Sequence, residues 1–157
     1  MPAPVRGWEA AEGLIYVLDR LKASAALVAG LDPDGTGAAK ITLGQADRAW
    51  RPSWVLLSLY SNAEPTRIAG ANGSKVWADQ VILVDCLTPG AYDLDTAKPL
   101  MNLIIAALDN SGGAAWDGHV YACRQAAGPL YLDTVDGQTV THNQVYFALE
   151  AQGAILP

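Results

Sequence analysis

The longest strand-like pattern in the chain spans residues 76–88. Its sequence, Val-Trp-Ala-Asp-Gln-Val-Ile-Leu-Val-Asp-Cys-Leu-Thr, is rich in β-branched and aromatic residues, which fit a pleated sheet better than a helix. Successive side chains of a strand point to opposite faces, and both faces are apolar at the centre. Ile82 and Val84 share one face, and Val81 and Leu83 share the other. We therefore expect something to cover each face of this strand.

Two segments show the periodicity of amphipathic helices. The first, residues 8–29, ends before Gly30. The second follows Pro89-Gly90 and runs from a cap at Asp95 to about Asp109. The apolar stripes of the two helices are formed by Leu14, Val17, Leu18, Leu21, Ala25 and Val28, and by Leu100, Leu103, Ile104, Ala107 and Leu108. If the two helices pack on opposite faces of the central strand, the chain covers both faces by itself.

Shorter apolar runs predict the remaining strands. A short strand at 40–43 and a strand at 54–60 precede the central one, and a strand at 119–125 follows the second helix. Gly128-Pro129 interrupts the pattern, so Leu130-Tyr-Leu-Asp is predicted to be a short extension or an edge piece. Asp136-Gly137 is a tight-turn signal before a final strand at 140–151.

The polar segment 61–73 contains Pro65, Gly70 and Gly73, and we expect it to join strand 54–60 to the central strand in antiparallel fashion. This order of elements predicts an α+β fold in which two main α-helices pack on a mostly antiparallel or mixed β-sheet. The length suits a single domain over residues 1–157, with a loose N-terminal arm at 1–7.

Composition narrows the classes of function. The formal net charge is -6, with 10 Lys and Arg residues in all, which argues against wrapping a nucleic acid backbone. The longest apolar stretch is too short to span a bilayer and the start lacks a secretion signal, so we expect a soluble protein made in the cytosol, with no membrane association. Cys86 and Cys123 are the only cysteines, and two reduced buried thiols are expected rather than a disulfide.

Candidate chemistry is sparse. A nucleophilic dyad would have to combine Cys86 or Cys123 with His119 or His142, and a cysteine in the middle of a strand is usually inert. The same four residues are all the soft metal ligands present, and none are paired at short spacing, so we expect no metal site. We expect no catalytic residues and no cofactor. A small-molecule-binding domain or a Cys/His hydrolase remains the alternative from another class.

Surface features suit association with other subunits. The central strand is apolar on both faces, and the segment 61–73 is long for a hairpin connection. Loops of that length in compact domains usually serve a function. We therefore predict that Arg67, Asn72 and the adjacent Lys75 contact a partner. The competing interpretation is that packing within the chain covers both faces.

Taken together, the segments resemble the small tail terminator (tail completion) proteins of long-tailed bacteriophages over nearly the whole chain. The resemblance lies in the order, spacing and character of the segments. They are Ile41-Thr-Leu-Gly, Arg51-Pro-Ser-Trp-Val-Leu-Leu-Ser-Leu, Val81-Ile-Leu-Val-Asp-Cys, Ile105-Ala-Ala-Leu-Asp, Gly128-Pro-Leu-Tyr and His142-Asn-Gln-Val-Tyr-Phe-Ala-Leu-Glu.

The resemblance implies a subunit that forms a ring, usually of six copies, in the tail or neck of the virion after assembly in the host cytoplasm. Such a ring caps the tail tube, stops tube polymerisation and offers a surface to the head-tail connector. DNA would pass through the ring without specific binding, which an acidic chain suits. A neck role, such as head completion or connector adaptor, is the nearest alternative.

Overall fold

The computed structural model describes residues 10–32, 35, 37, 40–44, 52–62, 66–70, 73–109, 111–115 and 118–155. The predicted arm at residues 1–7 lies outside them. The elements in chain order are α1 (Ala10–Lys22), α2 (Ala25–Leu31), β1 (Ile41–Leu43), β2 (Trp54–Asn62), β3 (Thr66–Gly70), β4 (Gly73–Pro89), α3 (Leu94–Leu108), β5 (Ser111–Ala115), β6 (Gly118–Val135) and β7 (Gln138–Ile155). The α+β class predicted from the sequence is confirmed.

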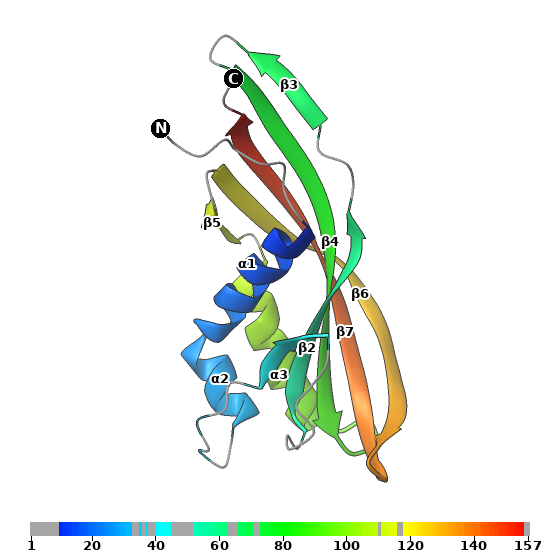
Figure 1. The fold of residues 1–157 in the computed structure, drawn as a ribbon. Coiled ribbons are helices and arrows are strands. Elements are labelled where there is room, and N and C mark those ends of the chain that lie inside the picture. Colours follow the sequence, from blue (N-terminus) through cyan, green and yellow to red (C-terminus); the bar gives the residue numbers. More distant parts are fainter. Residues whose placement is uncertain are drawn as a thin grey trace.

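The strands form one mixed sheet of seven strands, long and strongly twisted (Figure 1). The order is β1-β2-β4-β7-β6-β5, and β3 pairs with β4 beyond the end of β2. Only β1 and β2 pair in parallel; the other pairs are antiparallel, including the predicted pair of β2 with β4. The strand expected at 76–88 is therefore the centre of the sheet, between β2 and β7.

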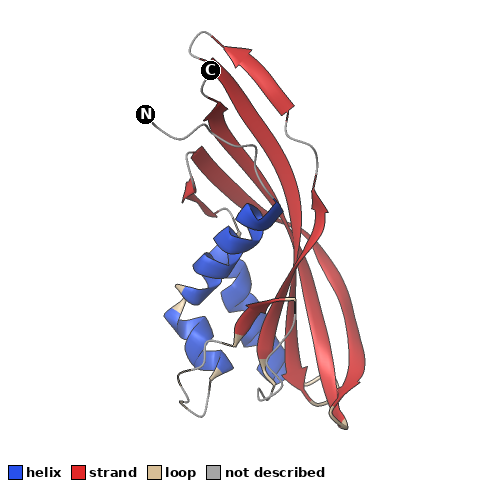
Figure 2. Ribbon diagram, in the orientation of Figure 1, coloured by secondary structure: helices blue, strands red, loops and turns tan. Residues whose placement is uncertain are grey.

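All three helices pack on the same face of the sheet (Figure 2). Ile82 and Val84 of β4 are fully buried there, next to Val145 and Phe147 of β7. The helices contribute Tyr16, Val17, Leu21, Leu27, Leu31, Leu100, Met101, Ile104 and Leu108 to the same core. The idea that the two predicted helices cover opposite faces is wrong. Val81 and Leu83, on the other face, are only half-buried.

The single helix expected at 8–29 is two helices, because the chain turns at Ser24. The Ser24 hydroxyl caps α2 by accepting a hydrogen bond from the backbone N–H of Leu27 at 3.4 Å. The break changes the helical register, so that Leu27 and Leu31 are buried while the predicted core residue Ala25 is exposed. The described residues thus form three helices where two main ones were expected.

The cap of α3 lies two residues before its predicted position. Asp93, and not Asp95, is the N-cap, and its carboxylate accepts hydrogen bonds from the Thr96 N–H at 3.4 Å and the Thr96 hydroxyl at 2.9 Å. Asp95 lies in the first turn, where its negative charge interacts favourably with the positive end of the helix dipole. A carboxylate is useful at either position, so the sequence did not distinguish them.

The segment 61–73 is not a long loop. β2 extends to Asn62, and Thr66–Gly70 forms β3, which pairs with the start of β4 from Thr66↔Trp77 to Gly70↔Gly73. The segment is therefore largely a β-hairpin, which projects beyond the helical layer (Figure 1).

The interruption expected at Gly128-Pro129 is also absent, because β6 runs continuously from Gly118 to Val135. The register of β6 against β7 shifts between Arg124 and Ala126 and between Ala127 and Leu130, which accommodates the glycine and the proline. A Cβ atom at Gly128 would lie 2.7 Å from the Cβ of Gln144, so only glycine fits this crossing. The predicted turn is confirmed: Asp136 and Gly137 have φ values of 51° and 77°, typical of a two-residue hairpin turn.

Candidate functional site

The sheet face opposite the helices, here called the open face, carries most of the polar chemistry that the structure describes. Strand alternation places on it Leu56, Ser58 and Tyr60 of β2; Val81, Leu83, Asp85 and Leu87 of β4; Tyr131 and Asp133 of β6; and Val140, His142, Gln144 and Tyr146 of β7. At one end of the face Trp54, Leu87 and Val140 form a second buried apolar cluster. The middle is more exposed, and Tyr60 packs edge-on against Tyr146 at 4.9 Å between ring centroids.

His142 is the centre of a polar cluster on the open face. Its Nδ1 lies 2.7 Å from Oδ2 of Asp85, and its Nε2 lies 3.3 Å from Oδ2 of Asp133. Only the first contact is a hydrogen bond, since Nε2 has no partner in hydrogen-bonding geometry. A carboxylate only accepts hydrogen bonds, so Nδ1 carries the proton that binds Asp85. The cluster therefore joins β4, β6 and β7 through one imidazole.

Asp85 is held mainly by its neighbours on β7. Both Asp85 and His142 expose only 10% of their side chains, whereas Asp133 exposes 55%. Gln144 adds a second donor to Oδ2 of Asp85, at 3.2 Å from its Nε2. A buried carboxylate requires such donors, because an unpaired buried charge is costly. The contact with Asp85 is thus structural, whereas the contact with the largely exposed Asp133 is screened by solvent.

Tyr131 covers the imidazole from the outer strand. Its ring stacks on His142 with 4.4 Å between ring centroids and 6° between the planes. Partial burial, followed by the negative charges of Asp85 and Asp133, raises the pKa of Tyr131 above its ordinary value. The phenol therefore remains protonated at neutral pH. The imidazole of His142 is thus contacted by the Tyr131 ring and by the carboxylates of Asp85 and Asp133. These contacts leave no described hydroxyl or thiol for it to activate.

The thiol of Cys86 lies on the helix-covered face, away from this cluster. Cys86 is fully buried, and burial, followed by the charge of Asp85, raises its pKa to about 12. It is paired with Asn143 in the register, so it and His142 lie on opposite faces. A Cys86 and His142 dyad, one form of the hydrolase alternative, is therefore excluded. His119 and Cys123 lie in β6 opposite Gln152 and Ala148, and their side chains are not among those described.

Two of the three predicted partner-contact residues belong to the β3–β4 hairpin. Arg67 lies in β3 opposite Val76, and Lys75 lies in β4 opposite Ile68, so the two cationic residues share one hairpin. Asn72 falls outside the described residues. This hairpin lies far along the sheet from the His142 cluster, because β3 pairs with residues 73–77 of β4 whereas His142 pairs with Leu87.

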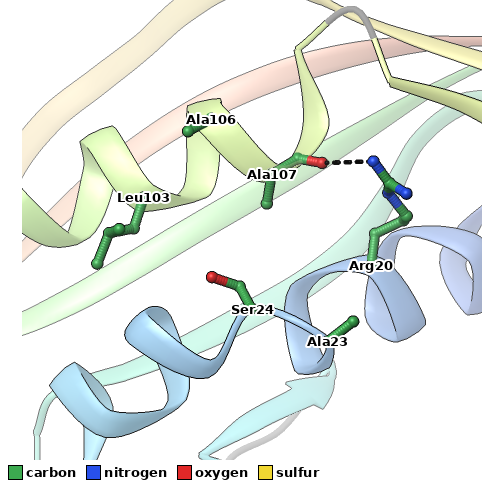
Figure 3. A pocket seen from close by; sticks show the side chains of 6 residues that line it. All are labelled: Arg20, Ala23, Ser24, Leu103, Ala106 and Ala107. Carbon is green, nitrogen blue, oxygen red and sulfur yellow. Dashed lines mark hydrogen bonds between the residues drawn. The ribbon is translucent and has the colours of Figure 1, made fainter.

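A shallow pocket lies on the helical side, between the α1–α2 junction and α3 (Figure 3). It has a volume of about 340 Å³ and is lined by Arg20, Ala23, Ser24, Leu103, Ala106 and Ala107. Its polar groups serve the helix ends. Nη2 of Arg20 donates to the Ala107 carbonyl at 3.4 Å, and its positive charge interacts favourably with the negative C-terminal end of the α3 dipole. Ser24 caps α2. Small residues at the junction leave the hollow open.

Among the described side chains, no group of three His, Cys, Asp or Glu residues is arranged to hold a metal ion. Within the same part of the chain, no helix has the length and apolarity that crossing a bilayer requires.

The His142 cluster was missed by sequence reasoning, although a signal existed. A two-residue turn at Asp136-Gly137 fixes the register of the hairpin, and counting outward from it places Tyr131 opposite His142. Asp136 was instead interpreted as a turn former, and Asp133 as the end of a short extension or edge piece. The contact with Asp85 depends on the pairing of β4 with β7, which no local pattern specifies.

Comparisons with known proteins identify a fold. No protein-family model matches the chain, and no curated protein matches it by sequence. Among solved structures, a chain of the "Virion of native gene transfer agent (GTA) particle" is similar, with a TM-score of 0.55 and 19% sequence identity. The match covers 87% of this chain and 92% of that chain. The two proteins therefore share a fold over nearly their whole lengths.

Proposed function

We propose that this chain is a structural protein of a phage-like virion, and that it is the tail terminator. In this role it forms a ring on the finished tail tube, stops tube polymerisation and provides the surface for head-tail joining. The observation that carries the proposal is the fold shared with a gene transfer agent virion chain over 87% of this chain and 92% of that one. A chance match of one common motif would not cover so much of both chains.

The surface chemistry supports an assembly role over a catalytic one. The described cluster at His142 ties three strands together, and its imidazole is engaged by Asp85, Asp133 and the Tyr131 ring. The buried thiol of Cys86 lies on the other side of the sheet. Neither arrangement offers a nucleophile next to a free base, which covalent catalysis needs.

The open face suits contact with other subunits or with a lumen. An antiparallel sheet can leave one face in solvent, but here that face presents Tyr60 with 65% of its surface exposed, beside Tyr146. Asp133, with 55% of its side chain exposed, gives the face negative charge, and DNA passing near it would not be retained. We propose that the chain is non-enzymatic, needs no cofactor and works through copies of itself, the tail tube protein and the connector.

The β3–β4 hairpin is the proposed contact with a partner in the particle, through Arg67, Asn72 and Lys75. The hairpin projects beyond the helices (Figure 1), and β3 pairs only with β4 in the described sheet. Exposed strand edges are available for pairing with another chain. Shortening the hairpin to a tight turn after residue 62 should leave the melting of the helix-covered core intact and abolish tube capping.

Tube growth in the presence of the pure protein tests the proposal. Tail tube subunits of the particle that this chain is proposed to join are polymerised with and without it, and tube lengths are measured by negative-stain electron microscopy. A terminator stops elongation and leaves a ring at one tube end. If the chain instead ignores tubes and binds purified head connectors, the neck role replaces the terminator role. A monomer that binds neither component, or that shows a hydrolytic activity sensitive to thiol alkylation, would overturn both.

A further inference from the structure

The polar cluster at His142 contains one gap. Nε2 of His142 and Oδ2 of Asp133 face each other across it at 3.3 Å, yet no hydrogen bond joins them. Nδ1 carries the proton donated to Asp85, so Nε2 presents a lone pair, and a carboxylate oxygen presents only lone pairs. Two acceptors at this distance repel each other unless a positively charged species lies between them.

Both acceptors are held in place by contacts on their other sides. Oδ2 of Asp85, which binds the imidazole, also accepts from Nε2 of Gln144 at 3.2 Å. Oδ1 of Asp133 accepts from the backbone N–H of Thr134 at 2.7 Å, which leaves Oδ2 for the gap. His142 exposes 10% of its side chain and Asp133 exposes 55%. The gap therefore lies where the protein meets solvent, between two atoms that are already oriented.

The strands around the gap supply negative charge and no cation of their own. Residues 76–89 and 125–149, which cover this part of β4, β6 and β7, contain no lysine or arginine. Asp85 and Asp133 both contact the one imidazole. Two carboxylates beside a neutral imidazole attract a cation from solution.

The arrangement has the geometry of a carboxylate–histidine–metal site. A histidine that binds a metal through one ring nitrogen usually donates its other ring N–H to a carboxylate, and Asp85 has that position here. Two ligands at about 2.0–2.2 Å from a tetrahedral zinc ion lie about 3.3–3.5 Å apart, whereas neighbouring ligands of an octahedral magnesium ion lie about 2.9 Å apart. The 3.3 Å between Nε2 and Oδ2 fits zinc.

We propose that Nε2 of His142 and Oδ2 of Asp133 bind one Zn²⁺ ion, with water in the two remaining positions of the tetrahedron. The ion links β6 to β7 near their hairpin turn. Among the described side chains no third ligand completes the site, so the ion exchanges with solvent and is not required for folding. This site belongs to the isolated chain and does not depend on the proposed role in the virion.

Zinc binding to the full chain, first stripped of metal with EDTA, tests the proposal. Competition with a chromophoric chelator should show one saturable site per chain. His142→Gln and Asp133→Asn should each raise the dissociation constant at least about tenfold, because each removes one of two protein ligands. Asp133 is largely exposed, so Asp133→Asn tests the site even if His142→Gln does not fold. Circular dichroism checks the fold of each variant.

Matched controls separate this site from other zinc ligands of the chain. Asp136→Asn makes the same chemical change at an exposed aspartate in the turn between β6 and β7. His119→Gln and Cys123→Ser change the other histidine and the other cysteine of the two expected soft-ligand pairs. All three controls should leave the dissociation constant unchanged.

Two further readouts report geometry and stability. Co²⁺ in place of Zn²⁺ should give the strong visible absorption of tetrahedral coordination, and Asp133→Asn should lose it. Zinc should raise the urea midpoint of the original chain, because an ion that binds only the folded state stabilises it, and should not raise that of Asp133→Asn.

Three results would overturn the inference. They are the absence of a saturable zinc site, controls that weaken binding as much as Asp133→Asn does, and an octahedral Co²⁺ spectrum. If no zinc binds, a proton on Nε2 is the cation that lies between His142 and Asp133.

Discussion

The two carboxylates that face His142 should differ sharply in their contribution to stability. Asp85→Ala removes the acceptor of a 2.7 Å hydrogen bond from a residue pair that exposes 10% of each side chain, and it also removes the acceptor of Gln144. The buried Nδ1–H of His142 and the half-buried amide of Gln144 then lose their acceptor. Losing a buried charge-assisted hydrogen bond of this kind costs about 2–4 kcal/mol.

Asp133→Ala removes a contact to the same imidazole with a far smaller expected effect. The Asp133 side chain is 55% exposed, and its 3.3 Å contact with Nε2 is not aligned as a hydrogen bond. Exposed ion pairs contribute about 0–1 kcal/mol because water and salt screen them. The predicted difference between the two variants is therefore at least about 1 kcal/mol.

Urea unfolding at pH 7 and one fixed protein concentration measures this difference, because oligomerisation makes stability depend on concentration. Thermal unfolding gives a second reading, with about 2–4 °C per kcal/mol expected for a chain of this length. A double-mutant cycle of Asp85→Ala with His142→Ala should show a coupling energy above about 1 kcal/mol. Equal losses for Asp85→Ala and Asp133→Ala, or no coupling with His142, would refute the assignment of Asp85 as the structural partner.

Three further predictions concern the helix-covered face and the strand crossing. Cys86 should resist iodoacetamide at pH 8 in the native chain and react once urea unfolds it, since a buried thiol with a pKa of about 12 is neutral. Mass spectrometry of the peptide containing Cys86 measures the labelling, and rapid labelling of the native chain would contradict this prediction. The Cys86 thiol ionises near pH 9 in the unfolded chain and near pH 12 in the folded one, so its contribution to stability should be complete below pH 9 and be lost between those values, by up to about 1.4 kcal/mol per pH unit. Urea midpoints of the original chain should therefore fall more steeply over this pH range than those of Cys86→Ala. Parallel curves for the two proteins would contradict a contribution from this thiol. Gly128→Ala should destabilise the chain by about 1–3 kcal/mol, because its Cβ would meet the Cβ of Gln144 at 2.7 Å and the Gln144 carbonyl oxygen at 3.0 Å; an unchanged urea midpoint would contradict the close crossing.

Local patterns predicted the central strand and its neighbours well. β-branched runs and the Asp136-Gly137 turn carry strong short-range signals, and the structure has strands at every predicted run. The side on which each helix packs could not be predicted in this way. Val81 and Leu83 are as apolar as Ile82 and Val84, and only the three-dimensional path of the chain places α1, α2 and α3 over the second pair.

Two errors have identifiable physical causes. Pro129 lacks an N–H donor and was expected to end a strand, but β5 pairs only with Gly118–Ala122, so no described strand borders β6 at Pro129 and the missing donor is tolerated. Ser24 was predicted to lie inside the first amphipathic helix, although serine is a preferred N-cap residue. A residue suited to a cap was thus assigned to a helix interior because periodicity alone was considered.

Gold labelling of purified particles tests whether this chain occupies the proposed position in the virion. Particles from cells that encode this chain are incubated with gold-conjugated antibodies against it and viewed by electron microscopy, with particles lacking its gene as the control. A tail terminator should be labelled only at the junction between head and tail, and the control particles should have abnormally long tails. Particles with no label, or with label elsewhere and normal tails in the control, would contradict this role.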